Sequence, residues 1–359
     1  MKTMKKAISI LLTMGLAVSS LTGCSSEEPK TDTPAPESTA DETEENTEGA
    51  AATEAADAVH LTLAHADTET GSLFGECMTE FKQKVEEASG GSIIIDIYPN
   101  GQLGTVAEYV AGIQNGSIDL APGASTFVAN FCTGVSVFDL PFLFENYDHV
   151  WASLDSEVGD SLTEELQNNG IEPLVWFGLG FRNVTTSEGH PINTLEDFKG
   201  FRIRTMTSAI HQSLFQALGA DAVPMDWGEL YTALQQGTVD GEENPFSQVL
   251  SSNIWEVNNV IVKSEHAFTP AVFMMSPKIT SKLTEEQVEI LRTCAEECTP
   301  VFRQKVVDMN DEALTTLVEE KKCVYVESLD KAALQAATES VYGQFPEYAE
   351  MVEKIRSLR

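Results

Sequence analysis

The sequence predicts an α/β fold of two lobes, in which mixed sheets are flanked by helices and a cleft separates the lobes. Two observations predict this fold. Strand-like and helix-like periods of apolar residues alternate from Val59 to Ala121, and a second alternation runs from Phe201 to Glu242. The chain has 359 residues, of which 42% are hydrophobic, so it is long enough for two medium-sized domains with their own cores.

The first set is predicted to run strand, helix, strand, helix, strand. An alternating strand at His60–Ala66 precedes apolar residues at helical spacing, which continue up to the helix-ending pair Gly90-Gly91. We expect a β-branched strand at Ser92–Tyr98, a helix from about Thr105 to Gln114 and a strand at Ile118–Ala121. This order favours a parallel or mixed sheet covered by helices.

A less regular stretch separates the two sets. Apolar, aromatic loops, the clearest at Leu140–Phe144, lead to a predicted helix that begins near Asp148 and ends at Asn168-Asn169-Gly170. A short strand is then expected at Leu174–Phe177.

The second set repeats the alternation in shorter units. Asp226, with Glu229 three residues later, has the spacing of a capping box that starts a helix at Trp227. The expected strands and helices are Phe201–Met206, Ser208–Leu218, Val223–Met225, Trp227–Gln236 and Val239–Glu242.

The C-terminal part is predicted to connect the two sets. A strand at 269–276 is expected to return to the first set, and residues 284–321 form a long helix that bridges the lobes. We expect a kink at Pro300, because proline removes one helical hydrogen bond. A strand at Cys323–Glu327 and helices up to Arg359 complete the chain.

Two sets joined by more than one crossing segment predict two lobes. Lobe 1 is expected to comprise residues 58–178 and about 270–305, and lobe 2 residues 179–269 and about 306–359. Ligands of open α/β sheets bind beyond the carboxyl ends of the strands, and clefts between lobes are preferred pockets. The binding chemistry is therefore sought in the cleft.

The N-terminus has the pattern of an export signal. Lys2, Lys5 and Lys6 precede an apolar run at 7–18, which is too short to span a membrane. The sequence Leu-Thr-Gly-Cys at 21–24 resembles a bacterial lipobox, which implies removal of residues 1–23 as a lipoprotein signal peptide and lipidation of Cys24. The alternative is an ordinary signal peptide followed by an incidental cysteine.

The segment after Cys24 is predicted to be a disordered acidic tether. Residues 27–57 contain no Val, Ile, Leu, Met or aromatic residue and consist largely of Glu, Thr, Ala, Asp, Ser and Pro. Such a segment cannot bury enough apolar surface to offset the entropy of ordering. With a lipid at Cys24, residues 24–57 would hold a soluble domain near the outer face of the cell membrane.

The charge excludes one large class of function. The chain has 22 Lys and Arg against 56 Asp and Glu, a formal net charge of −34. Nucleic-acid binding requires cations against the phosphates, so a nucleic-acid partner is excluded. The same charge repels anionic lipid, which leaves the lipid anchor as the only membrane contact that we expect.

The cysteines suggest no metal site. Without Cys24, the odd number of five cannot all pair internally. Cys294 and Cys298 lie one helical turn apart and are either core residues, a strained disulfide or half of a metal site. No histidine or second cysteine pair lies at ligand spacing, so core packing is favoured.

Enzyme signatures are missing from the sequence. It contains no G-x-S-x-G, H-E-x-x-H or G-x-x-x-x-G-K-[ST] motif, and no G-x-G-x-x-G fingerprint after a strand. We therefore expect neither catalytic residues nor a cofactor.

Three of the seven arginines fall close together in the second lobe. Arg202 and Arg204 point to one face of the strand in FRIRTM, and Arg182 lies shortly before them. The planar guanidinium fork matches a carboxylate in two parallel hydrogen bonds, which favours an acidic ligand. The alternative is that these arginines pair with the protein's own numerous carboxylates.

Two further residues of the second lobe are suited to a cleft. Pro245 restricts Asn244 to extended geometry, in which its amide can donate and accept hydrogen bonds, and Trp227 can cover the face of a ligand. Alternatively, Trp227 covers the core and Asn244 is a helix N-cap.

Five segments and the long helix interrupted by Pro300 together have a recognisable pattern. The segments are IDIYPNGQLG (95–104), LPFLFENYD (140–148), GFRNVTTS (180–187), FKGFRIRTM (198–206) and LGADAVPMDWGELYTALQQGTVDGEENP (218–245). They resemble the DctP family, the extracytoplasmic solute-binding proteins of tripartite ATP-independent periplasmic (TRAP) transporters, and the similarity spans about residues 59–355.

The resemblance implies ligand-binding roles in the second lobe. The carboxylate-clamping arginine of the family matches Arg204, and its second arginine matches Arg182. The cleft asparagine matches Asn244, and the aromatic residue after the Pro-Met motif matches Trp227. Glu242 stands where many relatives have glutamine and either alters the charge of the cleft or points outward.

In the first lobe the resemblance implies contacts from two loops. The loop after the first strand offers His65, Ala66 and Asp67, although it carries one extra residue relative to some relatives. The loop after Leu120 offers Ser125.

The implied function is that of a transport receptor. Its two lobes would close on a small organic acid, of C4-dicarboxylate or sugar-acid type, and pass it unchanged to the small and large membrane subunits of an ion-gradient-driven TRAP permease. The protein is expected to be a monomer. The alternatives are a surface sensor without a permease, the receptor of an ATP-driven importer and, least favoured, an esterase or lyase.

Overall fold

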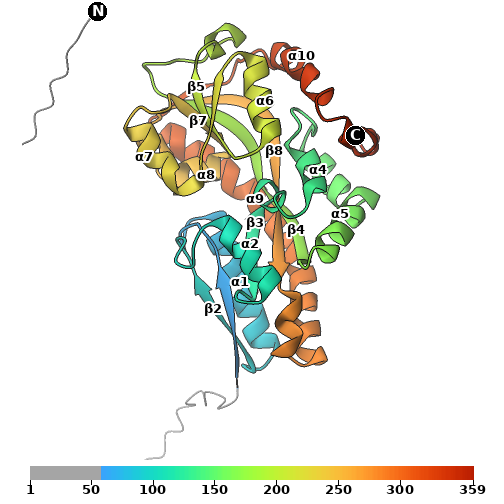
Figure 1. Cartoon of the computed structure of the whole chain (residues 1–359). Coiled ribbons are helices and arrows are strands. Elements are labelled where there is room, and N and C mark those ends of the chain that lie inside the picture. Colours follow the sequence, from blue (N-terminus) through green and yellow to red (C-terminus); the bar gives the residue numbers. More distant parts are fainter. Residues whose placement is uncertain (1–57) are drawn as a thin grey trace, which may run out of the picture. The chain divides into compact units, whose positions relative to one another are not determined.

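The computed structural model describes residues 58–359, which form one nine-stranded mixed sheet with flanking helices (Figure 1). The strand order is β2-β1-β3-β8-β4-β7-β5-β6, and β9 pairs with β8. The predicted signal peptide (1–23), Cys24 and the predicted tether (24–57) lie outside the described residues.

One end of the sheet carries the first predicted set. Strands β1 (Val59–Ala64) and β2 (Ile93–Tyr98) are parallel, and β1 also pairs in parallel with β3 (Leu120–Ala124). Helices α1 (Leu73–Ala88) and α2 (Val106–Asn115) connect them. The predicted order of these five elements is confirmed.

The other end carries the second set, with α6 to α8 around it (Figure 1). Strand β5 lies between β6 and β7 and is parallel to both. The elements are β5 (Arg202–Thr205), α6 (Ala209–Leu218), β6 (Asp221–Pro224), η3 (Trp227–Glu229), α7 (Leu230–Gln235), β7 (Gly241–Asn244) and α8 (Phe246–Ser251).

The helix expected at Trp227 begins there as the 3-10 turn η3, with Asp226 at its N-cap position, and continues as α7 from Leu230. The predicted capping box is wrong, because Asp226 makes no side-chain capping bond. The alternative of Asn244 as a helix N-cap is excluded, since it ends β7 and Pro245 takes the cap position of α8.

Two long antiparallel strands join the ends of the sheet. Strands β4 (Glu172–Thr186) and β8 (Val260–Met275) pair along most of their length, and β8 also pairs with β3, so the predicted return to the first set is confirmed. Both strands are longer than predicted. In β4 the apolar pattern is interrupted near Gly178, where a side chain would meet Phe268 at 2.5 Å, and the register shifts there.

A less regular region lies between β3 and β4. The single helix predicted from Asp148 is two helices, because Ser156 caps a new one by accepting a hydrogen bond from Val158 N. The elements are α3 (Ser125–Val128), η1 (Thr133–Asp139), α4 (Tyr147–Leu154) and α5 (Glu157–Asn168).

The long predicted helix is α9 (Glu285–Glu319), which is capped by Thr284 and Gln287 and includes Pro300. It packs against α1, β4 and α8, and thus against elements of both sets. The kink at Pro300 stays a prediction. The remaining elements are η2 (Leu195–Phe198), η4 (Ile254–Glu256), η5 (Pro277–Ser281), β9 (Val324–Val326), α10 (Lys331–Tyr342), η6 (Pro346–Tyr348) and α11 (Ala349–Arg356).

The cysteines of the described part are core residues. Cys294 and Cys298 pack with Cys77 in the apolar cluster between α1 and α9, and all five cysteines from 58 to 359 are buried and free. Within that range no three His, Cys, Asp or Glu side chains gather in a way that could hold a metal ion. No helix there is both long and apolar enough to cross a membrane.

Candidate functional site

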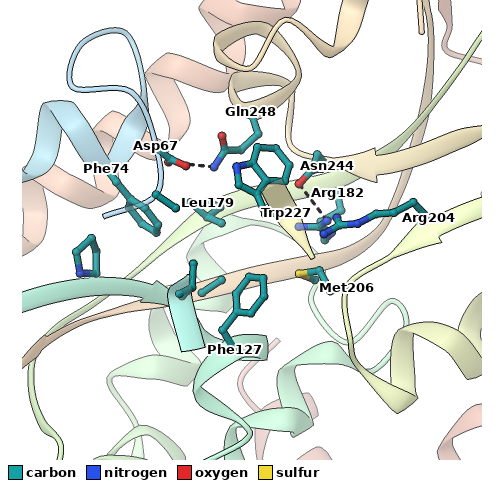
Figure 2. A pocket seen from close by; sticks show the side chains of 14 residues that line it. Asp67, Phe74, Phe127, Leu179, Arg182, Arg204, Met206, Trp227, Asn244 and Gln248 are labelled. Carbon is teal, nitrogen blue, oxygen red and sulfur yellow. Dashed lines mark hydrogen bonds between the residues drawn. The ribbon is translucent and has the colours of Figure 1, made fainter. Parts of the chain in front are cut away.

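A cavity is lined by residues from both ends of the sheet (Figure 2). Its polar wall residues are Asp67, Arg182, Arg204, Asn244 and Gln248. Its other wall residues are Ala66, Phe74, Val106, Pro122, Ala124, Phe127, Leu179, Met206 and Trp227.

Arg204 brings a charge into this wall from strand β5. Its side chain is 1% exposed, and both Nε and Nη2 donate to the carbonyl oxygen of Met225, at 3.1 and 2.8 Å. The guanidinium carbon lies 5.9 Å from the ring centre of Trp227. Burial lowers the pKa of Arg204 to about 10, so the group stays charged at neutral pH.

Arg204 has no carboxylate partner among residues 58–359, and its Nη1 atom donates to no acceptor there. The carbonyl of Met225 satisfies part of the guanidinium but carries no charge. A buried cation without a counter-ion is costly, because burial removes the water that would otherwise solvate it. This end of the cavity is therefore suited to an anion.

Arg182, on β4, lies in a different environment. Its guanidinium pairs with the carboxylate of Glu243 and also donates to the Glu243 carbonyl oxygen. Further bonds run from Nη1 to Thr269 Oγ1 at 3.1 Å and from Nη2 to Asn244 Oδ1 at 3.0 Å. Arg182 thus reaches the cavity wall with its charge already compensated.

Glu243 remains ionised behind Arg182. Burial alone raises the pKa of Glu243, but the charge of Arg182, the proximity of His211 and hydrogen bonds hold it well below its usual range. His266 Nε2 lies 3.0 Å from the carboxylate, and burial lowers the pKa of His266. Glu243 and Arg182 therefore form a buried ion pair whose net charge is zero.

The register of the sheet positions Asn244. It ends β7 directly opposite Asn183 of β4, one residue from Arg182. Its Oδ1 accepts from Arg182 and its Nδ2 donates to Glu242 Oε2, which fixes the orientation of the amide. One N–H of this amide is left for the cavity.

Glu242 matches neither outcome considered from the sequence. It does not line the cavity and does not point outward, but lies fully buried behind Asn244. Its carboxyl group also accepts from Thr185 Oγ1 at 2.6 Å. Burial raises the pKa of Glu242 to about 7.

Asp67 and Gln248 meet at the other side of the cavity (Figure 2). Asp67 follows β1 in the loop and Gln248 lies on α8, and Gln248 Nε2 donates to Asp67 Oδ2 at 3.2 Å. Burial raises the pKa of Asp67 to about 6 despite this hydrogen bond. The contact joins the first set to the second.

Most of the residues predicted from the sequence come together, and two do not. Arg204, Arg182, Asn244, Trp227 and Asp67 all line the cavity. His65 and Ser125 are completely buried and are not among the wall residues, although their chain neighbours Ala66 and Ala124 are, and their polar side-chain atoms have no hydrogen-bond partner among the described residues. For His65 burial also lowers the pKa to about 4.

The structure adds wall residues that the sequence analysis missed. Gln248 lies in the first turn of α8, and the available signal was a polar residue at the start of a helix directly after Asn244-Pro245. The other missed residues are apolar, and no sequence pattern separates an apolar cavity wall from the core. They are Phe74 at the start of α1, Phe127 in the short α3, Leu179 in the middle of β4 and Met206 directly after β5.

The alternative that the three arginines pair with the protein's own carboxylates holds for two of them and fails for the third. Arg202 forms an ion pair with Asp240 at the surface, and Arg182 forms one with Glu243 inside. Arg204 forms none with any described residue.

Comparison with known proteins decides the family. The profile of the DctP family, described as bacterial extracellular solute-binding protein, family 7, matches residues 63–348. The chain belongs to this family. The predicted resemblance is confirmed, and this DctP protein is a solute-binding receptor of the TRAP transporter type.

Its relatives include sugar-acid-binding proteins. A solute-binding protein of Verminephrobacter eiseniae is 30% identical over 285 residues, 79% of this chain and 84% of the relative. The sugar acid binding protein of Advenella mimigardefordensis in complex with galactonate superposes with a TM-score of 0.80 at 28% identity, covering 84% of this chain and 98% of that one. A TRAP periplasmic protein of a Polaromonas species bound to D-erythronate gives 0.78 at 30% identity, covering 83% and 98%.

The buried carboxyl group of Glu242 makes stability depend on pH. The unfolded chain loses this proton near the ordinary pKa of 4.5 and the folded protein only near 7, so the contribution of Glu242 to stability falls as pH rises between these values. We predict that Glu242→Gln raises the free energy of unfolding by roughly 1–3 kcal/mol more at pH 8 than at pH 5. Denaturant unfolding at both pH values measures this difference.

The matched control is Glu353→Gln, which removes the same charge at an exposed position. An equal effect of Glu242→Gln at pH 5 and pH 8 would contradict the prediction.

Proposed function

We propose that this DctP protein binds a small organic acid in the cavity through a carboxylate–guanidinium pair with Arg204. The observation that carries the proposal is the buried charge of Arg204, which has no acidic partner among the described residues. A bound carboxylate supplies the missing charge. The related complexes with galactonate and D-erythronate, which are both carboxylates, support this class of ligand.

The neighbouring side chains complete the site for the carboxylate. Nη1 of Arg204, the remaining N–H of Nη1 in Arg182 and the remaining N–H of Asn244 are donors that the fold leaves free. In a buried site each charge-assisted hydrogen bond contributes about 1.5–3 kcal/mol. Micromolar affinity requires about 8 kcal/mol in total, so one guanidinium with two or three further donors and apolar contacts suffices.

The proposal includes closure of two lobes, which follow the predicted ranges 58–178 with about 270–305, and 179–269 with about 306–359. The cavity wall includes Asp67, Phe74 and Phe127 from the range of lobe 1 and Arg204 and Trp227 from that of lobe 2, so a change in the separation of the lobes opens or closes it. Closure removes water from the carboxylate and strengthens its pairing.

The acid is delivered unchanged to a membrane permease of the TRAP type, with its small and large subunits as partners. The receptor is proposed to work as a monomer and to perform no catalysis. Both parts rest on membership in a family of solute-binding receptors. The strongly negative chain, with its formal charge of −34, fits a receptor whose attraction for an anion is local to Arg204.

The proposed location is the outer face of the cell membrane, where a lipid on Cys24 anchors the chain. The support is the Leu-Thr-Gly-Cys sequence at 21–24, the basic and apolar residues before it and the acidic segment after it.

Replacement of Arg204 tests the carboxylate pair. We predict that Arg204→Lys weakens binding at least tenfold, because an ammonium group cannot form the two parallel bonds of the guanidinium fork. Calorimetry would use the acid that gives the largest thermal shift in a screen of sugar acids, hydroxy acids and dicarboxylates. Arg202→Lys, two residues away on the same strand and paired with Asp240, should bind like the wild type. Unchanged affinity in Arg204→Lys would refute the proposed role.

Replacement of Cys24 tests the anchor. In cells that express the full-length chain, Cys24→Ala should move the protein from the membrane fraction to the soluble fraction or the medium and abolish its labelling by a radioactive fatty acid. Cys77→Ala, which changes a buried core cysteine, should keep both properties. A labelled, membrane-bound Cys24→Ala protein would show that the anchor lies elsewhere.

A further inference from the structure

The charges around the cavity allow for one ligand carboxylate. Arg182 is neutralised by Glu243, so Arg204 supplies the uncompensated positive charge of the wall. Asp67 lies on another part of the same wall and carries a carboxyl group. No lysine or further arginine lines this cavity. A second carboxylate on the ligand would therefore meet no cation, and at neutral pH an ionised Asp67 would repel it.

The hydrogen-bond donors of the wall are equally few. The side chains of Arg204, Arg182 and Asn244 lie together at one side of the cavity (Figure 2), and their free N–H groups match the needs of one carboxylate. The amide of Gln248 donates one N–H to Asp67, which leaves its second N–H as the one further amide donor on that side of the cavity. Apart from the indole N–H of Trp227, the side chains of the remaining wall present carbon and the sulfur of Met206.

This wall does not suit a ligand with a hydroxyl group on every carbon. Each hydroxyl buried against apolar side chains without a partner lowers affinity by roughly a factor of ten. An apolar ligand body, in contrast, gains from contact with Phe74, Phe127 and Leu179. One hydroxyl is accommodated, because Asp67 accepts a bond from Gln248 through Oδ2 and keeps Oδ1 as an acceptor.

We infer that the ligand is a monocarboxylate with an apolar body and at most one or two hydroxyl groups, in preference to a dicarboxylate or a polyhydroxy acid. This inference rests on the proposed function, because it places the single carboxylate at Arg204. The apolar body then lies along Phe74, Phe127, Leu179 and Met206, and Trp227 covers it.

Acids of equal carbon number test the inference. At six carbons the probes are 2-hydroxy-4-methylpentanoate, adipate and gluconate, and the same three classes are compared at four and at nine carbons, with an aromatic hydroxy acid at nine. Binding to the mature wild-type protein is measured by calorimetry at pH 7.5. We expect the tightest ligand to be a monocarboxylate with an apolar body, bound at least tenfold more tightly than the dicarboxylate and the polyhydroxy acid of its length.

Asp67→Asn tests the cause of the discrimination. Removal of this carboxyl charge should lower the ratio of dicarboxylate to monocarboxylate dissociation constants at least threefold, whereas the wall keeps its shape. The matched control is Glu69→Gln, which removes a charge from an exposed position in the same loop and should leave the ratio unchanged. An unchanged ratio in Asp67→Asn would refute the role of Asp67.

The outcomes separate this inference from the proposed function. If a dicarboxylate or polyhydroxy acid binds most tightly and Arg204→Lys weakens it, the inference fails and the carboxylate site at Arg204 stands. If the tightest acid binds Arg204→Lys as well as the wild type, or if no acid of any class binds the wild type, both fail.

Discussion

The site depends on one electrostatic constraint, which is that a guanidinium is buried where the fold offers it no carboxylate. Arg204 is 1% exposed and bonded to the carbonyl of Met225, so its charge costs free energy until an anion arrives. A solute receptor needs a buried charge without a partner of this kind, because the ligand then supplies the counter-ion and the gain appears as binding free energy. The same lack of a partner makes the free receptor less stable than it would be with an apolar residue there.

The surrounding structure keeps other charges from filling this role. Glu243 is the acid whose charge acts most strongly on Arg204, but its carboxylate is paired with Arg182, which lies on the adjacent strand β4. Glu242, the other acid of β7, lies behind Asn244, and burial raises its pKa to about 7. Two long strands, β4 and β8, hold this network between the two ends of the sheet. In this way the negatively charged chain retains a positive spot in its cavity.

The sequence allowed much of the fold to be predicted, because strand and helix periods are local. The prediction failed where residues of the binding site interrupt the apolar pattern of a strand. Strand β4 appeared to end at Phe177, since the glycines and the polar Arg182 that follow interrupt its apolar pattern. Arg182, Arg204, Trp227 and Asn244 were found through their motifs. The apolar wall, Gln248 and the placement of His65 and Ser125 were not, because they depend on contacts between segments far apart in the chain.

The most direct test is the free energy of unfolding of Arg204→Met without ligand, compared with that of the wild type at the same pH. Methionine fills a similar volume without charge, so we predict that the variant is the more stable of the two and that organic acids no longer raise its stability. An unliganded Arg204→Met protein that is less stable than the wild type would show that the charge of Arg204 is already satisfied within the fold, and would contradict its assignment as the incomplete half of an ion pair.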